Sequence, residues 1–397
     1  MEAVSQEFFS YNFSTAALHC AGMQTRQLNS QTPLKYVVAP MEGLTTFPSR
    51  LWLHMTSAPK YMTTPFIKVT KNYPDKNIPD EYAPELTVLK GALPYEIIPQ
   101  LITGEPDNFL RAADLIFPHV TDTVEINCGC PCPTSAGKLA GSGILGDSQL
   151  FFKSLERYVS HLGSGHLAVK MRSGFTSNEE FDHLFNGIKD MPFARLTVHA
   201  RTRKAGYKGL ADWTLIHAAS RKTKTPLYGS GDVTSLFSLD ERLGTAHNLG
   251  GIMIGRGAMI NPWLFSEIES GQKVEVPPRT LANALLCYAL IHELWQTDMK
   301  KLFARITQGR LGFHCGTDPA KWEKSAQILL QTAGGIPAVF TKSGMITDIP
   351  VGGNALARLK TLWGYLRTQL GTEYLRPNIM KSGDINRFFT DFFAATV

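Results

Sequence analysis

Long apolar runs are missing from this chain of 397 residues. No uninterrupted stretch of 18 apolar residues occurs, so the sequence offers no candidate for a membrane-spanning helix. The first 34 residues carry Glu2 and Glu7 and lack a basic start followed by an apolar core, so they do not resemble a secretory signal. We therefore expect no membrane association, and we interpret residues 1–34 as an N-terminal extension.

Cysteine is scarce, with six residues in the whole chain. They are too few and too unevenly spaced for a disulfide framework, which favours a reducing, cytoplasmic setting. Cys128, Cys130 and Cys132 stand at alternate positions and could be metal or cluster ligands. Pro131 and Pro133 interrupt the strand that would point all three in one direction, so we expect no metal site.

A glycine-rich dinucleotide turn is also absent after the first apolar run, which argues against a doubly wound open sheet. Eight short apolar runs instead alternate with amphipathic stretches. The expected strands are residues 36–40, 61–66, 95–101, 123–127, 166–170, 196–199, 226–228 and 251–254. The expected helices between them are residues 45–56, 106–117, 148–161, 178–189, 212–221, 234–243 and 258–268, and the link 67–94 lacks a clear helix. This alternation predicts an α/β fold, a (β/α)8 TIM barrel over residues 35–272.

The sequence changes character at Pro277-Pro278, which precede an apolar helical pattern. We expect a smaller all-helical domain over residues 273–397, with an atypical insertion around 303–352 that fits no clean period. Residues 271–397 contain 15 Lys and Arg against 9 Asp and Glu, whereas residues 1–270 contain 25 of each. A polyanion could dock on this basic part, although solvated surface lysines would give the same count.

The chain does contain one cysteine, Cys130, in a turn shortly after an expected strand. The segment Glu125-Ile126-Asn127-Cys128-Gly129-Cys130-Pro131 ends an apolar run with Cys130 held between a glycine and a proline. Such a turn lifts the thiol out at the carboxyl end of a strand, which is where barrel enzymes carry their chemistry.

Other polar residues end neighbouring strands. Lys170 closes the fifth expected strand, with Arg172 expected at the same barrel mouth, and His199 closes the sixth. Each alone is more often a structural residue, but together with Cys130 they mark three consecutive strand ends.

Two glycine-rich turns follow the seventh and eighth expected strands, Gly229-Ser230-Gly231-Asp232 and Gly255-Arg256-Gly257-Ala258. Loops at these two places commonly bind phosphate in barrels, since glycine lets backbone N–H groups approach the anion. With Lys170, His199 and the Gln100 amide, they suggest flavin mononucleotide across the barrel mouth.

Five segments in order resemble the motifs of flavin-dependent tRNA-dihydrouridine synthases, and the likeness runs from about residue 36 to the C-terminus. They are Ala39–Gly43, Ile126–Pro131, Val169–Arg172, His199–Arg203 with Gly206-Tyr207, and Met253–Gly257. The Asn-Cys-Gly-Cys form and the Gly-Tyr pair are most similar to the bacterial C-type subgroup.

This resemblance implies an oxidoreductase that reduces a uridine of the tRNA D-loop, at position 16, to 5,6-dihydrouridine. Hydride would come from reduced FMN to C6, the proton from Cys130 to C5, and the electrons from NADPH or NADH. The implied FMN contacts are Pro40, Met41, Glu42, Gln100, Lys170, His199, Ser230, Gly231, Asp232, Gly255 and Arg256. The implied tRNA contacts are Asn127, Arg172, Arg201, Tyr207, Arg358 and Lys360. We expect tRNA as the partner, with no protein partner, and a monomer.

Two other classes of protein remain alternatives. A flavin barrel of the dihydroorotate dehydrogenase or old-yellow-enzyme kind would share the lysine and the phosphate loops, but it would not need a basic helical tail. A non-catalytic RNA-binding module would not need Cys130, Lys170 and His199 at strand ends. Absorbance near 450 nm separates the flavin classes from the binding module, and tRNA binding separates the first two.

Overall fold

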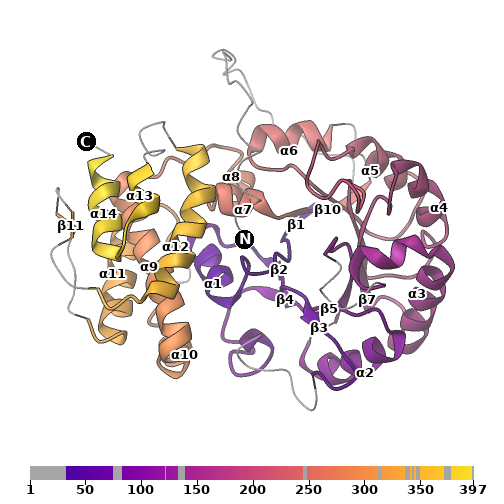
Figure 1. Cartoon of the computed structure of the whole chain (residues 1–397), viewed down its shortest axis with the longest axis horizontal. Coiled ribbons are helices and arrows are strands. Elements are labelled where there is room, and N and C mark those ends of the chain that lie inside the picture. The colour runs from indigo at the N-terminus through magenta and orange to yellow at the C-terminus, as the bar shows by residue number, and fades with distance from the viewer. Residues whose placement is uncertain are drawn as a thin grey trace.

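The barrel and the helices beside it come from a computed structural model of the chain (Figure 1). It describes residues 33–395 except 75–82, 121, 133–138, 245–247, 312–313, 336–339, 342–343, 346–348 and 371–376. Of the N-terminal extension expected over residues 1–34, all but the last two residues lie outside the described residues.

The ten segments of the main sheet form eight barrel strands. They are β1 (Lys35–Val38), β2 (Tyr61–Thr63), β3 (Ile67–Lys68), β4 (Glu96–Ile98), β5 (Gln100–Ile102), β6 (Val124–Cys128), β7 (Leu167–Arg172), β8 (Arg195–His199), β9 (Leu227–Ser230) and β10 (Leu249–Ile254). Pro65 separates β2 from β3 and Pro99 separates β4 from β5, because proline cannot donate to the ladder. All pairings in this sheet are parallel, and β2 pairs with β4 while β3 pairs with β5, so the sheet closes on itself. The predicted TIM barrel is confirmed.

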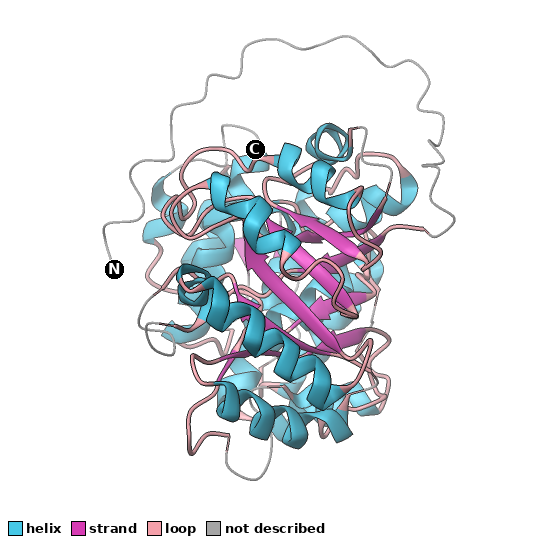
Figure 2. Ribbon diagram, turned by 90° about the vertical axis from the view of Figure 1, so that its right-hand side faces the viewer, coloured by secondary structure: helices cyan, strands magenta, loops and turns pink. Residues whose placement is uncertain are grey.

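Helices surround these strands, as Figure 2 shows. They are α1 (Phe47–Ser57), α2 (Pro106–Ile116), α3 (Ser148–Leu162), α4 (Phe181–Asn186), α5 (Trp213–Ser220), α6 (Leu236–Leu243), α7 (Arg256–Ile260) and α8 (Leu264–Ser270). The first six match the expected helices in order. The single helix expected over residues 258–268 is instead two short helices, α7 and α8, because Pro262 interrupts the segment. After β3, the one helical element in the described part of residues 67–94 is a 3-10 turn, Pro84–Leu86, in agreement with the expected lack of a clear helix there.

The C-terminal part is helical in its described residues, apart from a short hairpin of β11 (Phe340–Thr341) and β12 (Gly344–Met345). Its helices are α9 (Pro278–Thr297), α10 (Met299–Thr307), α11 (Pro319–Thr332), α12 (Gly353–Leu366), α13 (Pro377–Lys381) and α14 (Ile385–Ala394). Helix α11 contradicts the absence of a clean period over 303–352. Its signals were present: Asp318 caps the backbone N–H groups of Ala320 and Lys321, and Pro319 stands at the first turn.

This helical part lies against the barrel through α1, as Figure 1 shows. Trp52 of α1 donates its Nε1–H to the Ala284 carbonyl of α9 at 2.7 Å. Arg358 of α12 donates to the Gly43 carbonyl at 2.5 Å. The domain boundaries at 272 and 273 stay a prediction. Among the described residues, no helix has the length and apolarity needed to cross a membrane.

The strand register sorts side chains between the barrel interior and the helix layer. Asn127, Lys170 and Thr197 are paired neighbours on β6, β7 and β8, so their side chains share one face. Cys128 is out of phase with them and packs in the apolar core beneath the helices, 2% exposed. The interior face of the barrel is therefore polar where the site begins.

Candidate active site

Cys130 follows β6 on a turn that the side chains of Asn127 and Ser142 hold in place. The Asn127 Oδ1 accepts hydrogen bonds from the backbone N–H groups of Gly129 and Cys130, at 2.9 and 2.8 Å. The Cys130 carbonyl accepts from the N–H and the hydroxyl of Ser142, at 2.9 and 2.8 Å. A Cβ at Gly141 would lie 2.6 Å from that carbonyl, so only glycine allows this approach. Cys130 itself is partly exposed.

The Cys130 turn passes over the end of β7. A Cβ added at Gly129 would lie 3.9 Å from Lys170 Nζ. The ammonium of Lys170 makes no hydrogen bond or ion pair to any described residue, and burial lowers the pKa of this side chain to about 8, against the opposing effect of the Glu125 carboxylate. Because no described residue pairs with its charge, the Lys170 ammonium is a candidate for holding an anionic or polar ligand.

Arg172 is buried and holds the loops around the mouth together. Its Nε donates to the Gly129 carbonyl at 2.7 Å, and its Nη1 donates to the carbonyls of Thr202 and Gly206 at 2.9 and 2.7 Å. Within the described part of the chain, Nη2 makes no hydrogen bond. This nitrogen alone is available for the substrate contact expected of Arg172.

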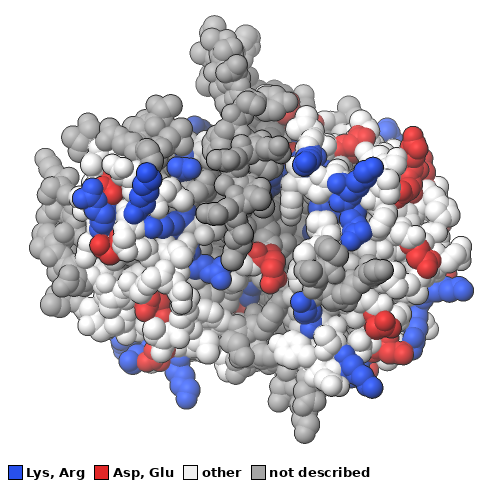
Figure 3. Space-filling view, in the orientation of Figure 1, with Lys and Arg blue, Asp and Glu red and all other residues white. Residues whose placement is uncertain are grey.

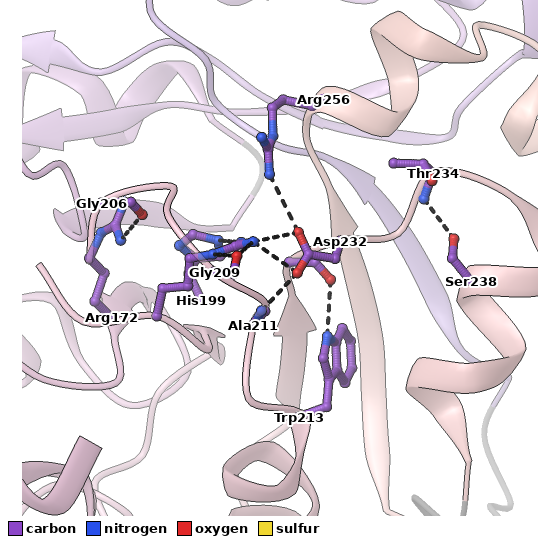
Figure 4. Close-up of polar contacts among 12 residues, drawn as sticks. Arg172, His199, Gly206, Gly209, Ala211, Trp213, Asp232, Thr234, Ser238 and Arg256 are labelled. Atoms are coloured by element: carbon purple, nitrogen blue, oxygen red, sulfur yellow. Dashed lines mark hydrogen bonds and ion pairs between the residues drawn. The ribbon is translucent and has the colours of Figure 1, made fainter. Parts of the chain in front are cut away.

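Asp232, just after β9, accepts hydrogen bonds from two arginines, and Figure 4 labels it together with one of them, Arg256. Arg201 donates to both of its carboxylate oxygens, at 2.7 and 2.9 Å, and Arg256 reaches Oδ1 at 3.4 Å. Arg201 also donates to the Gly209 carbonyl and, at 3.3 Å, to His199 Nε2. All its nitrogens are thus engaged inside the protein, so the structure shows Arg201 as a residue that holds the mouth together rather than one free to reach a tRNA.

His199 is neutral in this arrangement. Burial together with the positive charges of Lys170, Arg172, Arg201 and Arg256 lowers the pKa of its imidazole well below the ordinary value. An arginine is only a donor, so the contact with Arg201 makes Nε2 the acceptor and leaves the ring proton on Nδ1. The mouth therefore carries four nearby cations and an uncharged histidine.

The two glycine turns lie next to this group. The backbone N–H groups of Gly231, Asp232 and Gly255 make no hydrogen bond to any residue that the structure describes. Asp232 has a positive φ of 56°, and Gly231 has a φ of 125°, which only glycine adopts without strain. Free N–H groups in such a turn are suited to bind an anion. The phosphate site expected from the two glycine turns stays a prediction.

Tyr207 projects from the loop after β8 between two arginines. The guanidinium carbons of Arg172 and Arg256 lie 5.6 and 5.0 Å from its ring centroid, and the residue is 50% exposed. From α12, Tyr365 lies close enough to Arg256 and Tyr207 that both affect the pKa of its hydroxyl, which burial raises. The helical part thus borders the same mouth.

A buried polar cluster below the mouth was missed by the sequence reasoning. Glu125 accepts from Gln100 Nε2 at 2.6 Å and from Arg195 Nη2 at 2.6 Å, and neither Glu125 nor Gln100 is exposed. A signal existed: Glu125 and Asn127, like Arg195, Thr197 and His199, alternate along one face of a strand that should otherwise be apolar. The structure also places Gln100 beneath the rim, where Asn127 Nδ2 donates to its Oε1 at 2.6 Å.

The remaining expected residues lie at the edge of the site. Pro40, Met41 and Glu42 form the turn after β1, with Glu42 exposed and the Met41 N–H bonded to Thr45 Oγ1 at 2.8 Å. One guanidinium nitrogen of Arg358, on α12, donates to the Gly43 carbonyl next to this turn. Lys360 is partly exposed on the same helix. Figure 3 shows Lys and Arg side chains on both the helical and the barrel half of this face. The described residues hold no group of three or more His, Cys, Asp or Glu suited to a metal ion.

The fold and the site define a class of protein, a (β/α)8 barrel with a thiol, a partly buried ammonium and a turn of free backbone N–H groups at the carboxyl ends of its strands. The family model for dihydrouridine synthase matches residues 37–320, which is more than half of the chain. The chain belongs to the dihydrouridine synthase family.

Curated relatives agree over shorter stretches. The chain is 30% identical over 208 residues to a protein of Oryza sativa named tRNA-dihydrouridine(47) synthase [NAD(P)(+)]-like, covering 51% of this chain and 30% of the relative. It is 33% identical over 171 residues to a probable tRNA-dihydrouridine synthase of Rickettsia conorii, covering 43% of this chain and 51% of the relative. The chain thus spans about a third to a half of the length of these relatives. Among solved structures, the old yellow enzyme from Trypanosoma cruzi is similar with a TM-score of 0.42 and 13% identity, over 61% of this chain and 89% of that one.

Proposed function

We propose that this protein is an FMN-dependent oxidoreductase that reduces a uridine of tRNA to 5,6-dihydrouridine, with NADPH or NADH as the electron donor. One observation carries the proposal: the Cys130 thiol and the Lys170 ammonium, which has no partner among the described residues, lie on neighbouring strand ends, beside a turn with free backbone N–H groups. The names of both relatives include tRNA, and that of the Oryza sativa protein also includes NAD(P)(+), which supports the proposal.

The residues present suit a flavin mononucleotide. The N–H groups of Gly231, Asp232 and Gly255 would hold the phosphate, with Arg256 beside them. Lys170 would supply the positive charge next to the ring system, and the neutral His199 would offer a further hydrogen bond. The Gln100 contact stays a prediction, because the structure engages both ends of its amide within the protein.

Reduction of the C5–C6 bond of uracil needs a hydride at one carbon and a proton at the other. When bound, the flavin supplies the hydride to C6. Cys130 donates its thiol proton to C5, and its place on the rim of the mouth lets it reach the edge of a flipped base. Asn127 holds the turn that presents the thiol, and Arg172 ties that turn to the loop of Tyr207.

The tRNA has to deliver its base to this mouth by flipping it out of the folded nucleic acid, at a cost of about a few kcal/mol. Tyr207 and the free Nη2 of Arg172 would contact the flipped nucleotide. Lys360 and the remaining charge of Arg358 would contact the backbone, with the excess of Lys and Arg in residues 271–397 adding a longer-range attraction.

The identity of the uridine is a separate proposal. Position 16, expected from the likeness to the C-type subgroup, stays a prediction. Position 47 is the alternative, since it stands in the names of several relatives. The expected monomer and cytoplasmic location also stay predictions.

The direct test uses the purified full-length protein and tRNA from a strain that lacks its own dihydrouridine synthases. We expect a yellow protein with absorbance near 450 nm that forms dihydrouridine when NADPH or NADH is added, and sequencing of the product tRNA would identify the position. A colourless protein that still binds tRNA would favour the non-catalytic binding module. A yellow protein that reduces only free small molecules would favour the other flavin barrels.

Replacing Arg256 by Ala is predicted to weaken FMN binding by about 10–100-fold, the value of one charge-assisted contact to phosphate. The dissociation constant can be measured by the quenching of flavin fluorescence. The matched control is Lys222→Ala, which also removes one positive charge but from an exposed pair with Asp182. Unchanged FMN affinity in the Arg256 variant would place the phosphate elsewhere.

A further inference from the structure

A directed chain of side-chain hydrogen bonds runs from the barrel interior to the Cys130 turn. Glu125 accepts from Gln100 Nε2 at 2.6 Å, and Gln100 Oε1 accepts from Asn127 Nδ2 at 2.6 Å. Asn127 Oδ1 then accepts from the backbone N–H groups of Gly129 and Cys130, at 2.9 and 2.8 Å. The first three residues are between 0% and 6% exposed, so water cannot substitute for any of these partners.

The direction of this chain depends on a carboxylate at its inner end. The two ends of an amide have nearly the same shape, so neighbouring donors and acceptors decide which way Gln100 and Asn127 face. An ionised carboxylate accepts only, and Glu125 therefore holds the nitrogen of Gln100 toward itself and its oxygen toward Asn127. The Asn127 oxygen is then turned to the backbone of the cysteine turn.

Because Arg195 also donates to Glu125, even glutamine, the amide of nearly the same shape, cannot replace this carboxylate without loss of a contact. The Nη2 and Nε of Arg195 donate to the Glu125 Oε2 at 2.6 and 3.2 Å, while Gln100 donates to Oε1. The side chain at 125 thus meets donors at both oxygens. A glutamine there would direct its NH2 group against either Arg195 or Gln100, leaving a buried donor without an acceptor.

We infer that Glu125 is a positioning residue: paired with Arg195, it sets the amide directions of Gln100 and Asn127 and thereby the geometry in which the turn presents the Cys130 thiol. The role in catalysis rests on the proposed function, whereas the effect on the turn does not. The carboxylate also raises the pKa of Lys170 against the effect of burial, so one buried charge acts on both groups of the mouth.

The test compares Glu125→Gln with Glu85→Gln. Glu85 is a matched control because it is also a buried carboxylate that pairs with an arginine, Arg50 at 2.7 Å, but it contacts no residue of the cysteine turn. In the flavin-free protein, well below the unfolding temperature, the alkylation rate of the Cys130 thiol is followed by peptide mass spectrometry. We expect Glu125→Gln to change this rate at least fivefold and Glu85→Gln to leave it within twofold.

A second variant keeps the inference testable if Glu125→Gln fails to fold. Gln100→Met interrupts the chain but leaves the Glu125–Arg195 pair in place, and the same change in Cys130 alkylation is expected. In the enzyme with FMN, both variants should lower kcat for dihydrouridine formation at least tenfold with KM for tRNA within threefold of wild type. Alkylation within twofold of wild type in the folded variants would overturn the inference, even if activity falls. A wild-type protein that binds no flavin and forms no dihydrouridine would instead refute the proposed function.

Discussion

Cys130→Ala is expected to lower the rate of dihydrouridine formation by about 10²–10⁴-fold while FMN stays bound, because the variant lacks the acid that protonates C5. Cys130 is partly exposed on the turn after β6. Its backbone N–H donates to Asn127 and its carbonyl accepts from Ser142, and these bonds hold the turn whatever the side chain. Dihydrouridine per tRNA, measured by mass spectrometry of nucleosides, gives the activity, and absorbance near 450 nm gives the bound flavin.

Cys128→Ala is the matched control, since the two thiols are two residues apart. Cys128 is 2% exposed, faces the helix layer, and burial raises the pKa of its thiol to about 12, so it cannot reach the substrate. Its replacement leaves a small cavity and should keep activity within about tenfold of wild type. Equal losses from both replacements would refute the role of Cys130, as would a Cys130 variant that retains full activity.

Lys170→Met is expected to make the flavin-free protein more stable at pH 7 and at the same time to remove most of its activity. A partly buried ammonium without a partner among the described residues costs free energy, and its lowered pKa, about 8 against 10.5, measures that cost. Each pKa unit corresponds to about 1.4 kcal/mol, and partial exposure reduces the effect, so we expect a gain of about 1–3 kcal/mol in the free energy of unfolding. Urea unfolding of the flavin-free proteins would measure it.

The stability gain of Lys170→Met over the wild type should decrease as the pH rises. Above pH 8 the folded wild type loses the Lys170 proton while the unfolded chain keeps it up to about pH 10.5, so the wild type gains stability over this range. The stability difference between Lys170→Met and wild type should therefore shrink from pH 8 toward pH 10. Lys153→Met, on the exposed face of α3, is the control and should change neither stability nor activity appreciably. A Lys170 variant less stable than wild type at pH 7 would show that the ammonium is satisfied within the protein.

Much of the fold was predictable because it depends on local pattern. The eight strands follow from short apolar runs, and the phosphate-type turns follow from glycines placed directly after β9 and β10, where loops of a barrel meet. Helix α11 was missed although Asp318 and Pro319 mark its start, because glycine and threonine around it obscured the apolar period.

The roles of the arginines were less predictable, because they depend on partners distant in the sequence. Arg201 was expected at the tRNA, yet Asp232, 31 residues away, engages its guanidinium. Arg358 was expected to meet phosphates, and one of its nitrogens is bonded to Gly43, 315 residues away. A charged side chain in a sequence gives no sign of whether the fold will bring it an acceptor.

The sequence by itself determined the barrel, the family and a cysteine shortly after a strand end, since strand periodicity, glycine turns and the Asn127–Pro131 segment are local features. Only the tertiary structure decided that Cys128 packs in the core while Cys130 is partly exposed, that Lys170 has no partner in the described part, and that Glu125 and Arg195, 70 residues apart, form a buried ion pair below the mouth. The reason is physical: the closure of the barrel fixes which side chains share its interior, and the free energy of a buried charge depends on those neighbours rather than on its place in the chain.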